Sequence, residues 1–160
     1  MKQKVIETIV NIYRFTELEP EIQVLITKAK EQTKNSYAPY SKFHVGAAVL
    51  LENGALFLGS NQENAAFPAG ICAERAALSY ANSEYPNEPV KAIAIAAYAQ
   101  QEFSAQPVAP CGICRQSLLE VERRFQSPIS IYLFGTEYIY HISSAEKLLP
   151  MAFSLDKNEA

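Results

Sequence analysis

All three cysteines of the 160-residue chain lie in two short segments, Cys72-Ala73-Glu74-Arg75 and Pro110-Cys111-Gly112-Ile113-Cys114. Three thiolates can hold one zinc ion at three corners of a tetrahedron, and an open fourth corner is typical of a catalytic site rather than a structural one. Glu74 follows Cys72 by two residues, where a carboxylate can move protons without binding the metal. Together these residues predict metal-assisted hydrolysis, with Cys72, Cys111 and Cys114 as ligands and Glu74 as the proton carrier.

Other uses of the three cysteines account for fewer of these residues. A structural zinc site usually needs four ligands, and the fourth would have to be His44 or His141, the two histidines of the chain. A redox-active pair of Cys111 and Cys114 would leave Cys72 without a role. An odd cysteine count also argues against a disulfide framework, so we expect free thiols in a reducing compartment and hence a cytoplasmic protein.

A zinc ion bound by three thiolates carries a net negative charge, which weakens it as a Lewis acid. A positively charged side chain is therefore expected close to the ligands. Arg75 and Arg115 both lie beside the cysteines in the sequence, and we favour Arg75 as a donor to thiolate sulfur.

The ligands must be positioned by helices that begin at the cysteines. Residues 72–82 and 112–125 are predicted to form two helices, so that the ligands open both of them. A helix N-terminus has unpaired N–H groups and a partial positive charge, which favour thiolate over thiol. The apolar run over 90–98 predicts a buried strand between the two helices. A right-handed β-α-β crossover would then bring both helix starts to one end of the sheet.

The rest of the pattern predicts further helices and strands around this core. Glu19-Pro20 marks the start of a helix that runs to about Asn35, and Asn53-Gly54 predicts a two-residue hairpin turn with both residues at positive φ. The other predicted elements are an extended segment or strand over 5–15, strands over 43–51, 55–60, 129–134 and 138–142, loops over 61–71 and 100–109, and a short helix over 144–149. Helices that alternate with buried strands indicate a layered α/β domain.

The charge and hydropathy of the chain argue against two classes of partner. The net charge is −3, and no run of Lys or Arg forms a basic stripe, so nucleic-acid binding has no electrostatic support. No apolar stretch reaches about 18 residues, the length that a membrane-spanning helix needs. The first 15 residues are interrupted by Glu7, Asn11 and Arg14 and make a poor signal peptide. We therefore expect no nucleic-acid partner and no membrane association.

The two cysteine segments resemble those of the zinc nucleoside deaminases, and the match extends to Arg115-Gln116 after the last ligand. Cysteine rather than histidine at position 72 is similar to the cytidine deaminases. Three further segments resemble small tetrameric members of that family: Tyr37 to Ala48, Asn61-Gln62-Glu63-Asn64-Ala65, and Leu148-Leu149-Pro150 with Phe153. The resemblance covers residues 20 to 155 approximately.

The resemblance implies a three-layer α/β/α cytidine-deaminase-like fold with a central mixed sheet of about five strands. It implies hydrolytic deamination of cytidine and 2′-deoxycytidine to uridine and deoxyuridine with release of ammonia, as part of pyrimidine salvage. Zinc hydroxide would attack C4 of the ring while Glu74 shuttles protons. It also implies one zinc ion per subunit and a homotetramer. Two alternatives stay open: a deaminase of another aminopyrimidine nucleoside such as an antibiotic, and a non-catalytic zinc-stabilised binding module.

The resemblance also assigns roles to residues outside the ligand set. Asn61 and Glu63 would bond the ribose hydroxyls, and Phe43 would pack on the pyrimidine face. Phe153, and likewise Phe67, would reach the substrate of a neighbouring subunit. The remaining assignments are Ala73 as a substrate contact and Gln116 with Arg75 as supports of the ligands. The expected divisions are an N-terminal extension over 1–18, the deaminase domain over 19–155 and a frayed tail over 156–160.

Overall fold

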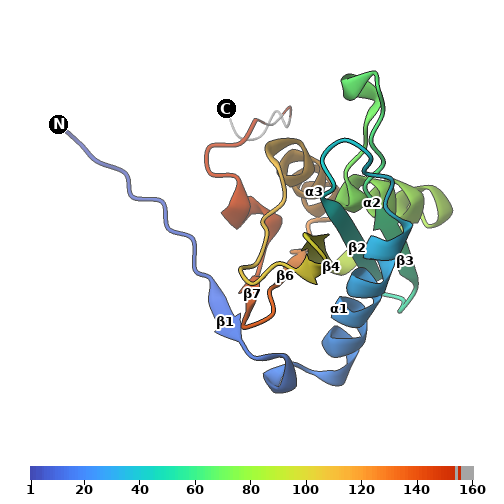
Figure 1. Cartoon of the computed structure of the whole chain (residues 1–160). Coiled ribbons are helices and arrows are strands. Elements are labelled where there is room, and N and C mark those ends of the chain that lie inside the picture. Colours follow the sequence, from blue (N-terminus) through green and yellow to red (C-terminus); the bar gives the residue numbers. More distant parts are fainter. Residues whose placement is uncertain (154, 156–160) are drawn as a thin grey trace.

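The computed structural model describes residues 1–153 and 155, which form a mixed sheet with helices on both faces (Figure 1). The strands are β1 (Asn11–Tyr13), β2 (His44–Leu51), β3 (Leu56–Ser60), β4 (Val90–Ala99), β5 (Glu102–Phe103), β6 (Ser130–Phe134) and β7 (Ile139–Ile142). The helices are α1 (Pro20–Gln32), α2 (Ala73–Glu84) and α3 (Gly112–Phe125), with 3-10 turns η1 (Phe15–Glu17), η2 (Thr33–Asn35), η3 (Phe67–Ala69) and η4 (Ala145–Leu148).

The described residues build a seven-stranded sheet in the order β1-β7-β6-β4-β2-β3, with β5 paired to β4. Strands β4 and β6 run parallel, and the other pairs are antiparallel. The predicted three-layer arrangement is confirmed, and its five expected strands correspond to β2, β3, β4, β6 and β7. The short strands β1 and β5 add to them. Strand β5 lies in the predicted loop over 100–109, where two residues are too few to show a period.

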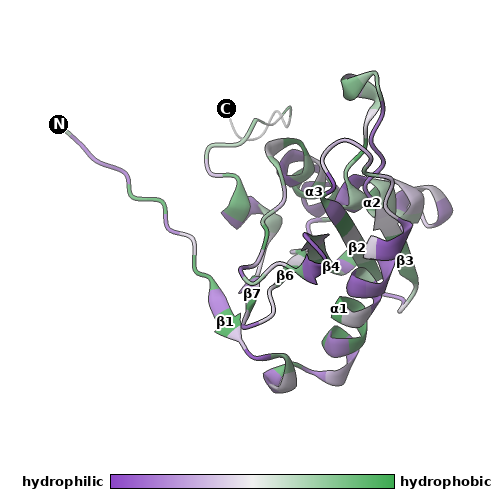
Figure 2. Ribbon diagram, viewed as in Figure 1, coloured by the Kyte–Doolittle hydropathy of each residue, from purple (hydrophilic) through white to green (hydrophobic). Residues whose placement is uncertain are grey.

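The two faces of the sheet carry side chains of different size. Ile93 and Ile95 of β4 belong to the core that α2 and α3 cover. The alternate residues Ala92, Ala94 and Ala96 belong to the core beneath α1, together with Leu25, Ile26 and Ala29 of that helix. Hydrophobic and hydrophilic bands alternate along α1, as expected for a helix with one buried side (Figure 2). Small alanines let α1 lie close to the sheet.

The hairpin between β2 and β3 has a longer loop than predicted. The Leu51 N–H donates to Ala55 O at 2.9 Å, and the Gly54 N–H donates to Leu51 O at 3.0 Å. Three residues therefore close the hairpin, and of these Gly54 alone has a positive φ, +85°. This is a turn followed by one left-handed residue, so the prediction that both Asn53 and Gly54 have positive φ is wrong. The Asn53 side chain instead accepts the Ala55 N–H at 2.9 Å.

The N-terminal strand is much shorter than the predicted extended segment over 5–15. Strand β1 pairs with β7 only at Asn11 to Tyr13. Residues 1–10 are exposed and form no regular structure, and only the N-terminal end extends away from the rest of the protein (Figure 1). Farther along this segment, the Thr8 hydroxyl donates to Lys147 O at 2.6 Å. The predicted helix over 144–149 is the 3-10 turn η4, and the tail from residue 156 lies outside the described residues. Within residues 1–153 and 155, no helix has the length and apolarity that crossing a membrane requires.

Two consecutive crossovers place the helix starts together. Helix α2 connects β3 to β4, and α3 connects β4 to β6. Since β3, β4 and β6 run in the same direction, both helices begin at the same end of the sheet. The cysteines, which stand at these helix starts, therefore meet as the sequence predicts.

Candidate metal site and adjoining pocket

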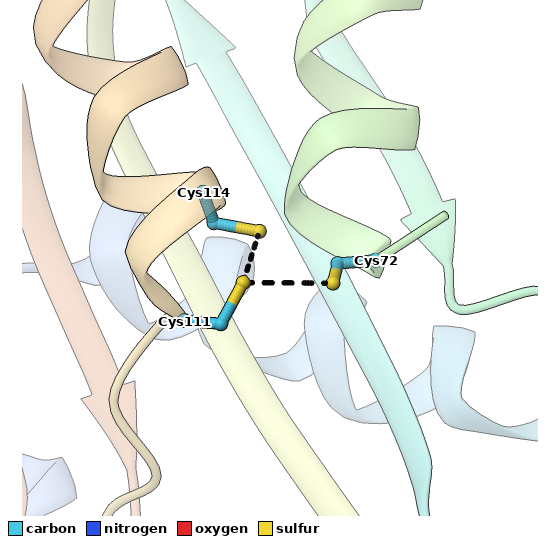
Figure 3. Close-up of side chains that lie close together, drawn as sticks. All are labelled: Cys72, Cys111 and Cys114. Atoms are coloured by element: carbon cyan, nitrogen blue, oxygen red, sulfur yellow. Dashed lines mark hydrogen bonds between the residues drawn. The ribbon is translucent and has the colours of Figure 1, made fainter. Parts of the chain in front are cut away.

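The sulfur atoms of the three cysteines form a compact cluster between α2 and α3. Cys111 Sγ lies 3.8 Å from Cys72 Sγ and 3.5 Å from Cys114 Sγ, and all three atoms lie within 4.8 Å of one another. Figure 3 shows the three side chains pointing toward one another from the first residues of the two helices. Tetrahedral zinc with Zn–S bonds of about 2.3 Å requires S–S separations of about 3.8 Å. The cluster thus fits zinc without rearrangement of the backbone.

Local sequence fixes where each helix starts. Cys72 and Cys111 are the N-cap residues of α2 and α3, both with extended backbone. Helix α2 packs directly on β3 because Gly59 has no side chain: a Cβ there would lie 2.4 Å from Ala73 O. The partial positive charge of both helix starts favours negative charge on the sulfur atoms of these N-cap residues.

The cluster shares its protons unequally. Hydrogen bonding from Cys114 lowers the pKa of Cys72 to about 6, and the positive charge of Arg75 contributes to the same shift. The hydrogen bond with Cys72, together with burial, raises the pKa of Cys114. Without metal, the hydrogen-bonded pair of Cys72 and Cys114 therefore retains a proton between its two sulfur atoms. Metal binding must displace that proton, so zinc affinity depends on pH.

Glu74 lies in the first turn of α2 and is 5% exposed. Burial raises the pKa of its carboxyl, while a hydrogen bond with Cys114 acts in the opposite direction. A carboxyl group with a raised pKa takes up and gives back a proton readily near neutral pH. Its place beside the sulfur cluster is the one expected of a proton carrier.

The two candidate arginines have different surroundings. Arg75 is half-buried, and its charge acts on Cys72. The guanidinium of Arg115 is already bound: Nε donates to Pro110 O at 2.8 Å, and Nη1 donates to Leu148 O at 3.0 Å. These two hydrogen bonds of Arg115 could not be predicted from the sequence. They leave Arg75 as the better candidate for a donor to sulfur.

A pocket of about 590 Å³ adjoins the sulfur cluster at Cys72. It brings together three of the predicted substrate contacts, Asn61, Glu63 and Phe67, with Tyr40 and Ser41 from the loop before β2. The predicted contacts Phe43, Ala73 and Phe153 are not among the described residues that line it. No sequence pattern indicated that Tyr40 and Ile71 border the same pocket.

Both polar residues expected to bind the sugar are anchored. The Asn61 side chain accepts the Val45 N–H at 2.7 Å and donates to Phe43 O at 2.9 Å, and so binds the start of β2. The Glu63 carboxylate accepts the Tyr40 N–H at 2.8 Å and the Ser41 N–H at 3.3 Å. Hydrogen bonding from Ser41 lowers the pKa of Glu63, which therefore presents a carboxylate to the pocket.

A small bridge ties this wall of the pocket to the metal site. Gln62 and Ile71 exchange backbone hydrogen bonds of 2.9 and 3.0 Å. Gln62 stands between Asn61 and Glu63, and Ile71 directly precedes Cys72. The bridge therefore sets the distance between the polar wall and the metal.

The C-terminal segment is bound along α3. Gln116 Nε2 donates to Phe153 O at 3.3 Å, while the Phe153 side chain is 71% exposed. Deeper in the protein, the Glu122 carboxylate binds the start of η4. Sequence reasoning missed Glu122 because a glutamate on this helix reads as a solvent-facing residue. Its spacing of four from Leu118 and eight from Cys114, both fully buried, was an available signal.

Comparison with known proteins places these features in a family. A family model described as the cytidine and deoxycytidylate deaminase zinc-binding region matches residues 20–126. A cytidine deaminase of Sporosarcina psychrophila is 37% identical over 134 residues, covering 84% of this chain and 92% of that protein. The crystal structure of a cytidine deaminase from Burkholderia pseudomallei superposes with a TM-score of 0.69 at 37% identity, covering 81% and 97% of the two chains. One from Mycobacterium tuberculosis superposes with a TM-score of 0.67 at 29% identity, covering 86% and 100%.

Proposed function

The chain belongs to the cytidine deaminase family, and on this premise we propose that it deaminates cytidine and 2′-deoxycytidine hydrolytically. The products are uridine or deoxyuridine and ammonia. One observation carries the proposal: a buried carboxyl, Glu74, lies beside a three-sulfur cluster that fits zinc and borders a nucleoside-sized pocket.

Cys72, Cys111 and Cys114 hold the zinc ion, one per subunit. When bound, zinc supplies Lewis acidity that lowers the pKa of a coordinated water to about 7. Glu74 accepts a proton from the water whose oxygen bonds to C4 and passes this proton to ring N3. It then carries the remaining proton of the new C4 hydroxyl to the amino group, so that the C4–N bond breaks and ammonia leaves. The buried position of Glu74 suits proton transfer, because burial raises the pKa of its carboxyl toward the pKa values of the groups with which it exchanges protons. Arg75 offsets the excess negative charge of the thiolates.

The pocket wall orients the nucleoside. Asn61 and Glu63 bind the ribose hydroxyls, with Glu63 held as a carboxylate by the loop that contains Ser41. Phe43 packs on the pyrimidine, and Ala73 contacts the ring from the start of α2. Gln116 supports the ligand helix beside Arg115. A panel of aminopyrimidine nucleosides, assayed beside cytidine, separates this substrate class from a modified nucleoside such as an antibiotic.

Glu74→Gln tests the mechanism. The variant is expected to keep its zinc but to lose turnover by about 10²–10⁴-fold, because amide nitrogen cannot shuttle protons. Loss of ultraviolet absorbance of cytidine measures turnover, and metal analysis measures zinc. Glu84→Gln makes the same change at the exposed end of the same helix and should retain parent activity. Parent turnover in Glu74→Gln, or no turnover of cytidine by zinc-loaded parent protein, would contradict the proposal.

The assembly is a homotetramer with active sites shared between subunits. Phe67 and Phe153 are 77% and 71% exposed and offer aromatic surface to a neighbouring chain. The N-terminal extension over 1–18 adds strand β1 and acts as an interface arm, because Val5 and Ile9 on it are largely exposed. Light scattering of the full chain and of a variant lacking residues 2–10 tests both statements. Three free thiols favour the cytoplasm, where the reaction would serve pyrimidine salvage.

A further inference from the structure

The carboxylate of Glu122, on α3, is buried, and each of its oxygens accepts two hydrogen bonds from other parts of the chain. It is 8% exposed. Oε2 accepts the Ile129 N–H at 2.8 Å and the Ala145 N–H at 2.7 Å. Oε1 accepts the Ser144 hydroxyl at 2.6 Å and the Glu146 N–H at 3.2 Å. A buried carboxylate with four donors holds its partners in one geometry, since losing any of them leaves charge without compensation.

Three of these donors belong to the start of η4. The N–H groups of Ala145 and Glu146 are the free donors of a helical first turn, so Glu122 caps η4 from outside. This fixes the position of η4 along α3. The other end of η4 is Leu148, whose carbonyl oxygen accepts Arg115 Nη1 at 3.0 Å.

Arg115 completes the connection to the metal site. It directly follows the ligand Cys114, and its Nε donates to Pro110 O at 2.8 Å, directly before the ligand Cys111. The planar guanidinium can hold Pro110 O and Leu148 O together only while both carbonyls keep their places. Displacement of Leu148 would therefore release one side of the guanidinium and loosen the segment that carries Cys111.

We propose that Glu122 is a positioning residue for zinc, acting through η4 and Arg115 on the backbone before Cys111. The proposal rests on the zinc site described above and adds a residue that touches neither metal nor substrate. Residues that orient metal ligands typically change metal affinity by about 10–100-fold when replaced. The exposed ligand Cys111 is the one whose position depends most on such support, because solvent rather than protein lies on its open side.

The test is the rate at which zinc-loaded full-length protein transfers its metal to a chromogenic chelator at 25 °C. Glu122→Gln replaces an acceptor oxygen by a donor group and is expected to release zinc about 10–100-fold faster than the parent. Glu120→Gln makes the same change at an exposed position of the same helix and should release zinc at the parent rate. Leu25→Ala lowers stability in the core beneath α1 and controls for general destabilisation. Should Glu122→Gln not fold, Ser144→Ala removes one donor only and should show a smaller acceleration.

A second comparison tests the route through Arg115. Arg115→Lys cannot hold both carbonyls, so it should release zinc quickly, and adding Glu122→Gln should cause little further acceleration. Equal acceleration by Leu25→Ala and Glu122→Gln at matched melting temperature, or independent effects of the two α3 changes, would overturn the proposal. Parent protein that holds zinc but leaves cytidine intact would refute the proposed activity and leave this inference standing.

Discussion

Replacing Gly59 by alanine is expected to disturb the metal site from beneath α2. A Cβ at Gly59 would lie 2.4 Å from Ala73 O and 2.5 Å from Ala77 N, both backbone atoms of the helix. No side-chain rotation relieves such a clash. To restore a separation of 3.4 Å from Ala73 O, the start of α2 must move by about 1 Å.

This shift would move one metal ligand relative to the other two, because Cys72 is the N-cap of α2, whereas Cys111 and Cys114 lie at the start of α3. A movement of about 1 Å is large beside sulfur separations of 3.5 and 3.8 Å. Misplacement of this size can cost about 10²-fold in rate. Overpacking itself costs about 1–3 kcal/mol of stability. Gly59→Ala should therefore lose about 10²-fold in kcat/KM for cytidine and release zinc faster than the parent.

Gly46→Ala provides a matched control on the opposite face of the sheet. A Cβ at Gly46 would lie 2.1 Å from Ala29 O, so this change displaces α1 and leaves the ligand helices in place. Both variants should melt at lower temperature, but Gly46→Ala should keep its zinc. The assays are thermal unfolding, zinc transfer to a chelator and cytidine turnover. Equal zinc loss in the two variants, or parent turnover in Gly59→Ala, would refute the reasoning.

Three further outcomes follow from the site and the sheet edge. Cys114→Ser should bind no zinc by metal analysis and unfold at lower temperature, because a buried ligand is lost; retention of one zinc per chain would argue against the ligand set. Asn61→Ala should raise KM for cytidine, leave turnover of free cytosine unchanged, and cost about 1–3 kcal/mol because the Val45 N–H loses its partner, as chemical denaturation would show. Burial lowers the pKa of His141 from 6.5, so the unfolded chain binds that proton more tightly than the folded chain does. Its contribution to stability is complete above pH 6.5 and declines as the pH falls through the lowered value, and His141→Gln should flatten denaturation midpoints measured between pH 7 and pH 5.

Periodicity and residue spacing in the sequence predict most of the helices and strands and the position of the metal site. The bounds of α3 agree with the predicted helix. The clustering of the three cysteines could be predicted because cysteines at the starts of two helices are typical of zinc binding. The predicted hairpin loop is one residue too short. Asn53-Gly54 is compatible with two turn geometries, and the pairing of Leu51 with Ala55 decides between them. Local pattern also could not show that Arg115 binds the carbonyl oxygen of Leu148 together with that of Pro110, because Leu148 contacts Arg115 only after η4 folds onto α3.

The ligands come from two helices that belong to successive crossovers, so zinc would act as a cross-link between them. Binding to the folded chain alone adds about 1.4 kcal/mol of stability for each tenfold rise of free zinc above the dissociation constant. The melting temperature of the protein would then report the free zinc concentration around it. A cell that runs short of zinc would then hold protein that is less stable as well as less active.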